Sequence, residues 1–205
     1  MTLKNFLKQI LLYSFIVLIF ISNYSCSGSC CSSDNKTDVP SQVLKKSDSF
    51  IKSRTGDEFF EKYISPDFQL TKNTPPYYEM VYKFSIPEKV YANGLIKFTV
   101  DSSGNVMTNR DIIGIPNCYR SEDECTFKID KKWAKQIAIE KGLEQGIKDW
   151  SIEFIWNPQR DRYVWHVRSI SQEIDGEIGY RAEGDEMLIS PANGEVILKD
   201  KWRIN

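Results

Sequence analysis

Two halves of the chain show the same order of hydrophobic patterns, an apolar helix face followed by segments with strand-like alternation. In each half, four apolar residues recur at positions i, i+1, i+4 and i+5, which is the spacing of one helix face. They are Phe59, Phe60, Tyr63 and Ile64 in the first half, and Trp133, Ala134, Ile137 and Ala138 in the second. We therefore expect an internal repeat of helix, strand, strand, strand, turn and strand.

The first half carries signals for the ends of its elements. Thr55 and Glu58 have the spacing of a capping box, so the helix is expected to start at Thr55, and Pro66 is expected to end it. Gly104 lies in a short polar connection and can supply the positive φ of a hairpin turn. Segments rich in aromatic or β-branched residues are predicted to be strands: 68–71, 77–86, 95–101 and 106–113.

The second half repeats this plan. Asp130 is the expected N-cap of its helix and Gly142 the expected C-cap. Strands are predicted at 151–156 and 163–170, and on both sides of a glycine-containing turn within 187–197. Short helices beside antiparallel hairpins predict an α+β fold, with one helix packed on one antiparallel sheet in each unit. The first module is expected at 47–114, a linker at 115–129 and the second module at 130–205.

The segment 128–202 resembles a PepSY domain, a small module found in metallopeptidase propeptides and in bacterial envelope proteins. The resemblance rests on the helix with Ala134 and Ala138, on the strand 163–167 and on the ending 188–196, where Ser190 replaces the usual Asp. The first module shares less of this pattern. The resemblance implies two PepSY-like units that bind or inhibit another protein and carry no catalytic residues.

The N-terminus has the pattern of an export signal. Two lysines precede an almost unbroken apolar run that is too short for a comfortable membrane span. Cys26 follows, so residues 1–25 resemble a bacterial lipoprotein signal, in which this cysteine becomes the lipidated first residue; Asn23 stands where such signals usually have leucine. An ordinary cleaved secretory signal and an uncleaved anchor are the alternatives. Residues 26–46 are polar and are predicted to form a flexible tether.

Charge and cysteine usage narrow the functional classes. The formal net charge is −1, which gives no electrostatic footprint for nucleic acid. Cys118 and Cys125 flank a polar loop in an exported chain, so we expect a disulfide between them, the alternative being a redox pair. With one histidine and no Cys-x-x-Cys pair, no zinc site is expected.

No catalytic constellation stands out. A serine triad built on His166 would need a nucleophile elbow, and no Gly-x-Ser-x-Gly occurs. The carboxylates between 173 and 186 alternate with glycines and are expected in solvated hairpin loops. We therefore expect no enzyme activity, metal or cofactor.

Aromatic residues are the remaining candidates for a site. Trp156, Tyr163 and Trp165 belong to a set larger than one small sheet face needs. Most are expected in the core, and the rest are candidates for an exposed partner-binding patch. The sequence thus predicts a cell-envelope protein, held to a membrane by a lipid on Cys26, that binds or inhibits another envelope protein such as a peptidase. An immunity-type lipoprotein that neutralises a toxin is the alternative, and a hydrolase that uses His166 is a third option.

Overall fold

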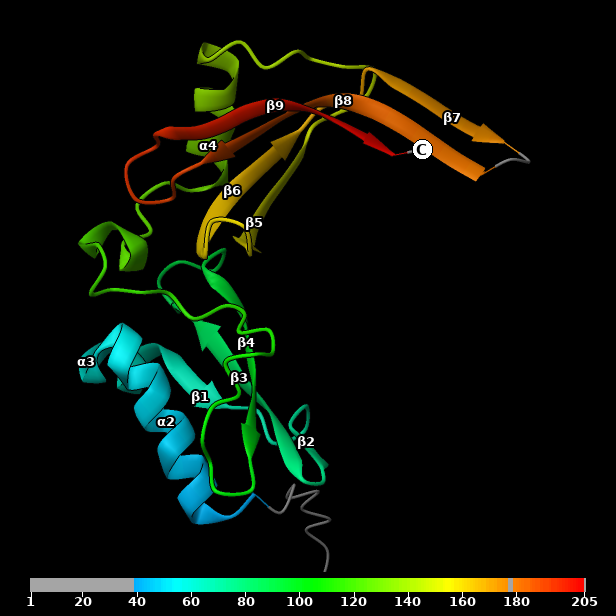
Figure 1. Ribbon diagram of the computed structural model, residues 1–205. Coiled ribbons are helices and arrows are strands. Elements are labelled where there is room, and N and C mark those ends of the chain that lie inside the picture. The colour runs from blue at the N-terminus through cyan, green and yellow to red at the C-terminus, as the bar shows by residue number, and fades with distance from the viewer. Residues whose placement is uncertain (1–38, 177–178, 205) are drawn as a thin grey trace, which may run out of the picture. The chain divides into compact units, whose positions relative to one another are not determined.

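The computed structural model describes residues 39–176 and 179–204, and its described part is α+β, as predicted. Helices α2 (Ser41–Thr55), α3 (Asp57–Tyr63) and α4 (Lys131–Glu140) accompany two antiparallel sheets (Figure 1). The predicted signal peptide, Cys26 and most of the predicted tether lie outside the described residues. No helix in the described part is long and apolar enough to cross a membrane.

The first sheet is built around β3 (Tyr77–Ser85). β4 (Asn93–Asp101) pairs with one side of β3 along its whole length. Two short strands, β1 (Ile64–Pro66) and β2 (Lys72–Thr74), pair with opposite ends of its other side. Helices α2 and α3 lie against this sheet and contribute to a core whose fully or almost fully buried members include Val43, Ile51, Phe60, Tyr82, Phe98 and Val100.

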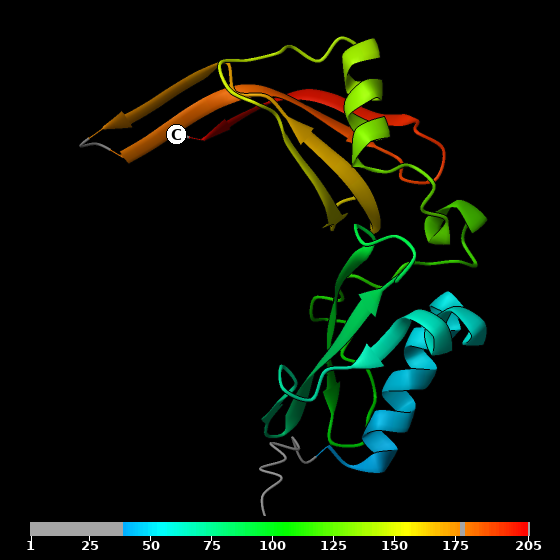
Figure 2. The ribbon, with the colours of Figure 1, turned by 180° about the vertical axis from the view of Figure 1, so that it is seen from behind.

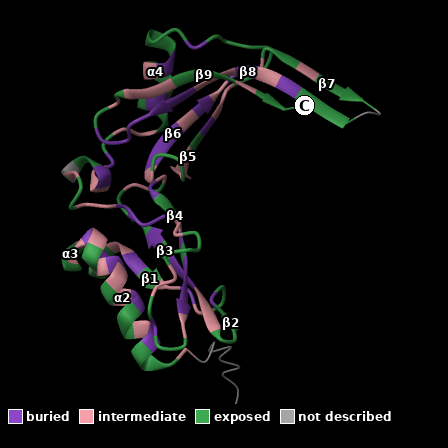
Figure 3. Cartoon of the chain, in the orientation of Figure 1, coloured by how far each residue is buried: buried purple, intermediate pink, exposed green. Residues whose placement is uncertain are grey.

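The strands of the second sheet are also antiparallel. β5 (Ser151–Asn157) pairs with β6 (Arg162–Arg168), β6 with β8 (Gly179–Ile189), and β8 with β9 (Val196–Ile204). β7 (Gln172–Gly176) pairs with the other half of β8. Helix α4 packs on β5 and β6 (Figure 2). Ala134 and Ala138 are completely buried there. Buried residues are concentrated in the strands β3 and β6, whereas β7 is mostly exposed (Figure 3).

Both sheets therefore follow one plan, with a helix followed by successive antiparallel strands. The first sheet lacks a full strand in the last position of this plan among the described residues. The segment predicted as a strand at 106–113 forms only the isolated bridges Val100–Val106 and Lys97–Ile113. The segment predicted as a strand at 68–71 is instead a turn. There the Asp67 carboxylate accepts hydrogen bonds from the backbone N–H groups of Gln69 and Leu70.

The first helix differs most from its prediction. Thr55 does not start a helix but ends α2, which begins at Ser41, inside the segment predicted to be a tether. The following Gly56 has φ 83° and separates α2 from α3. The buried stripe of α2 repeats every fourth residue (Val43, Ser47, Ile51 and Thr55), and half of its members are polar, so hydrophobicity alone does not reveal it.

The helix α4 begins where its sequence predicts. The Asp130 side chain accepts a hydrogen bond from the backbone N–H of Trp133 at 2.8 Å, as an N-cap residue does. Gly142 follows the C-cap residue Lys141 with φ 71°, the left-handed conformation typical after a helix end. Trp133 departs from the predicted apolar face, because 60% of it is exposed.

Candidate protein-binding site

The aromatic residues predicted as a partner surface lie mostly inside the protein. Tyr163 is 4% exposed and Trp165 is 2% exposed, so both belong to the core, where most of these aromatic residues were expected, and neither forms an exposed patch. Trp156 is half-buried, and its ring lies 5.1 Å from that of Tyr163 in an edge-on arrangement. The register pairs Trp156 with Tyr163, so these side chains share one face of the sheet, and other parts of the chain cover that face.

Tyr163 joins the second sheet to the first. Its ring lies 5.3 Å from Phe84, and its hydroxyl donates a hydrogen bond to the backbone oxygen of Gly114 at 3.1 Å. Gly94 makes this approach possible, since a Cβ there would lie 2.6 Å from the tyrosine hydroxyl oxygen. Burial raises the pKa of Tyr163 above its ordinary value.

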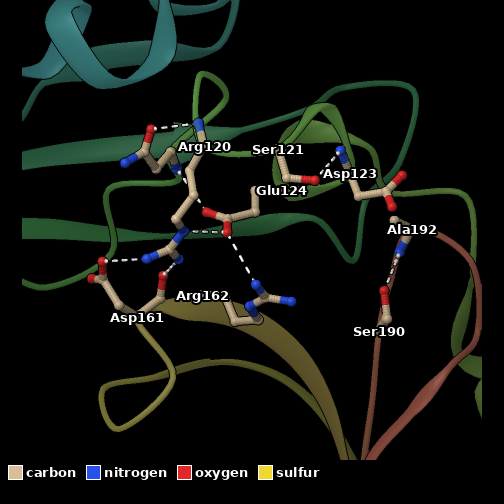
Figure 4. A network of polar contacts seen from close by, with 9 residues as sticks. Arg120, Ser121, Asp123, Glu124, Asp161, Arg162, Ser190 and Ala192 are labelled. Carbon is tan, nitrogen blue, oxygen red and sulfur yellow. Dashed lines mark hydrogen bonds and ion pairs between the residues drawn. The ribbon is translucent and has the colours of Figure 1, made fainter.

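The predicted disulfide between Cys118 and Cys125 is present, with a Cα–Cα distance of 5.2 Å. It closes a loop that carries Arg120 and Glu124, and these two side chains connect the loop to the β5–β6 turn (Figure 4). The Glu124 carboxylate is 3% exposed and accepts hydrogen bonds from Arg120 Nε at 2.6 Å and from Arg162 at 3.1 Å.

The contacts of Arg120 and Glu124 hold the β5–β6 turn at two neighbouring residues, Asp161 and Arg162. Arg120 also donates to the backbone oxygen of Asp161 at 2.8 Å (Figure 4). Asp161 has a positive φ of 50°, unusual for a residue other than glycine, and the arginine contact holds it in place. The beginning of β6 and the end of β5 are therefore held against the disulfide loop.

The outer edge of β5 is open. β5 pairs with β6 alone among the described strands. Its sequence Ser-Ile-Glu-Phe-Ile-Trp-Asn has a single charged residue, Glu153. Exposed edges present unpaired N–H and C=O groups, and proteins usually blunt them with charged side chains, especially lysine. The other edge of this sheet follows that rule, because β9 carries Lys199, Asp200, Lys201 and Arg203.

A groove of about 390 Å³ runs beside the open edge of β5. We call it the β5 groove; it is lined by Tyr91, Asn93, Lys131, Ile152, Glu153, Phe154, Ile155 and Trp165. The aromatic members are held rigidly, since the Tyr91 hydroxyl donates to the backbone oxygen of Phe127 at 2.9 Å and Trp165 Nε1 donates to Ile129 at 2.7 Å.

The β5 groove places three aromatic rings and two charged side chains beside the unpaired edge of β5. The ring of Tyr91 lies 6.0 Å from that of Phe154 and 5.3 Å from that of Trp165. Lys131 and Glu153 supply one charge of each sign beside these rings. Main-chain pairing with an edge strand supplies affinity in such sites, and pockets for alternate side chains supply specificity. Of the predicted partner-binding residues, only Trp165 lines this groove, as a buried wall.

The candidates for catalysis do not lie in this groove. His166 Nε2 is 2.7 Å from Glu186 Oε2, and both side chains are largely buried on β6 and β8. The carboxylates expected in loops that belong to the described residues instead lie on strands, where Glu173 pairs with Lys148 and Glu183 pairs with Arg203 at 2.9 Å. Among the described residues, no group of three or more histidine, cysteine or acidic side chains could hold a metal ion.

Sequence reasoning missed the β5 groove because edge position depends on strand order. The scarcity of charge in β5 was visible, but a buried central strand has the same scarcity. Tyr91 comes from the connection between β3 and β4, far from β5 in the sequence.

The chain was compared with family models, with curated proteins and with solved structures. No family model matches it, and neither does any curated protein or any solved structure. The function is therefore argued from the residues and geometry of this chain.

Proposed function

We propose that this protein is an exported, lipid-anchored envelope protein that binds another envelope protein by accepting one of its strands at the edge of β5. The observation that carries this proposal is the open, nearly uncharged edge of β5 beside a groove lined by Tyr91, Phe154 and Trp165. An extended segment of the partner would pair with the β5 backbone and place an apolar side chain in the groove.

Two features of the sequence support the proposed location at a membrane and the proposed class of partner. Residues 1–25 resemble a lipoprotein signal followed by Cys26, and this resemblance is the basis for the membrane anchor. The resemblance of 128–202 to a PepSY domain favours a non-catalytic binding or inhibitory role and makes an envelope peptidase the first partner class to test. The partner's strand would then be held next to the membrane that carries the anchor.

The binding role can be tested with a photo-crosslinking amino acid at Glu153, whose side chain is exposed on β5. The control position is Lys72, an exposed residue of the edge strand β2. Irradiation of intact cells should yield a discrete protein adduct from position 153 and none from position 72. Equal adducts from both positions would show collision rather than binding and would end the proposal.

Strand addition itself is tested by a matched pair of substitutions. Ile155 and Leu198 are half-buried aliphatic residues on two edge strands of the second sheet, β5 and β9. Ile155→Lys gives β5 the charge that natural edges use for protection, and should abolish the adduct at position 153. Leu198→Lys adds the same charge to β9 and should leave the adduct at position 153 intact. Retention of the adduct in Ile155→Lys would refute pairing at β5.

A further inference from the structure

The outer face of α4 combines lysines with exposed apolar side chains. The helix turns Ala134 and Ala138 into the core, and both are completely buried. Away from them it exposes Trp133 at 60% and Ile139 at 51%. Three exposed lysines lie on the same short helix: Lys131, Lys132 and Lys135. We call these five exposed residues the α4 face.

The charge of the α4 face is not neutralised by the protein. None of its three lysines has an ion pair or side-chain hydrogen bond within residues 39–176 and 179–204. The two acidic residues nearest in sequence are engaged elsewhere. Asp130 caps the helix, and Glu140 accepts a hydrogen bond from Gln136 at 2.9 Å. The positive charge of Lys132 and Lys135 is thus directed to solvent, in a chain whose net charge is −1, whereas Lys131 also lines the β5 groove beside Glu153.

The position of these lysines is unfavourable for the helix itself. Lys131 and Lys132 open α4, and its first turn has no acidic residue. The helix macrodipole places partial positive charge at this end, so cations there are destabilising and acidic residues are preferred. A placement that opposes helix stability, together with an exposed tryptophan, indicates that the face serves an interaction.

We propose that the α4 face docks on an anionic lipid surface. Lysines on the polar side of a surface helix are attracted to anionic headgroups, and each strengthens binding about fivefold. Tryptophan is favoured at the headgroup level, where its ring is amphipathic, and exposed aliphatic side chains such as Ile139 enter the same boundary. This contact goes beyond partner binding at β5 and does not require lipidation of Cys26.

Vesicle binding tests the proposal in the full chain carrying Cys26→Ser, which cannot be acylated at that position. Phosphatidylcholine vesicles are compared with vesicles in which about one third of the lipid is phosphatidylglycerol, a fraction chosen to give a strong surface potential. Lys132→Gln/Lys135→Gln should weaken binding to the anionic vesicles about 25-fold. Added salt should weaken the unsubstituted chain as well.

The control is Lys45→Gln/Lys72→Gln, which removes the same charge from exposed lysines on α2 and β2. All variants share the same N-terminal residues, so any contribution of the apolar N-terminal run cancels. The control should bind like the unsubstituted chain. Equal affinities of the two double variants, or equal binding to neutral and anionic vesicles, would overturn the proposal.

Trp133 provides a second, local measurement. Brominated lipids should quench part of the tryptophan emission of the unsubstituted chain when it is bound to anionic vesicles, and Trp133→Phe should remove that part. Quenching that is unchanged in Trp133→Phe would contradict docking through α4. If the lysine pair matters only for capture of an acidic protein and not for vesicle binding, the α4 face is a protein interface and the lipid proposal is wrong.

Discussion

The buried carboxylate of Glu124 makes the sharpest prediction about stability. It lies 2.6 Å from Arg120 Nε and 3.1 Å from Arg162, and only 3% of the side chain is exposed. Removing one member of a buried ion pair costs about 3–5 kcal/mol when the remaining charge stays buried. Here the arginine side chains are 41% and 38% exposed and stay hydrated, so the cost for Glu124→Gln is expected to be about 2 kcal/mol.

Urea denaturation measures this loss as a change in the free energy of unfolding. A double-mutant cycle with Arg162→Gln should give a coupling energy of about 1 kcal/mol, because the two side chains share one contact. Glu195→Gln, at an exposed position, is the control and should change stability by less than about 0.5 kcal/mol. A Glu124→Gln loss as small as that of the control, or additive effects in the cycle, would refute the assigned role of the network.

Three further predictions follow from single contacts. Tyr163→Phe removes the buried hydrogen bond to Gly114 and should lower the free energy of unfolding by about 1–2 kcal/mol in urea; no change would mean that the bond adds nothing. Gly184→Ala places a Cβ on the backbone oxygen of Ser169 and should cost about 3 kcal/mol in thermal denaturation, whereas Gly176→Ala, with no atom within 4 Å, should be nearly silent. The Lys83 ammonium and two backbone N–H groups hold the pKa of Asp67 below its ordinary 3.8, so its contribution to stability is present above about pH 4 and is lost as pH falls through the lower folded-state pKa. Asp67→Asn should therefore reduce stability at pH 7 by about 1–3 kcal/mol, and a difference from the unsubstituted protein that persists unchanged into acid would refute this origin.

Local signals with a single physical cause were predicted well. The Asp130 cap, the strands at 77–86 and 151–156, and the pairing of Cys118 with Cys125 each depend on residues close in sequence. Thr55 was misplaced because the capping-box spacing also occurs by chance, and the polar members of the α2 stripe hid the preceding helix.

Features that depend on distant contacts could not be predicted. Alternation places Tyr163 and Trp165 on one face of their strand, but it does not show that Phe84, Phe127 and Tyr91 cover that face. The same limit applies to the β5 groove, since one of its walls comes from the β3–β4 connection. Trp133 was expected inside because its spacing fits the helix face, but consecutive helix residues point about 100° apart, so Trp133 turns away from the face of Ala134 and its ring remains exposed.

Tyr91 and Phe154 pack against the hydrophobic cores of both sheets and also line the β5 groove. A ligand held in that groove therefore binds only the state in which both sheets are folded. By mass action, it must raise the unfolding temperature of the whole described domain rather than of the second sheet alone. Occupancy of the β5 groove by the proposed partner would thus be coupled to folding through the rings of Tyr91 and Phe154. A core substitution in the first sheet that loosens Tyr91 would then reduce the affinity for a partner bound at β5 of the second sheet.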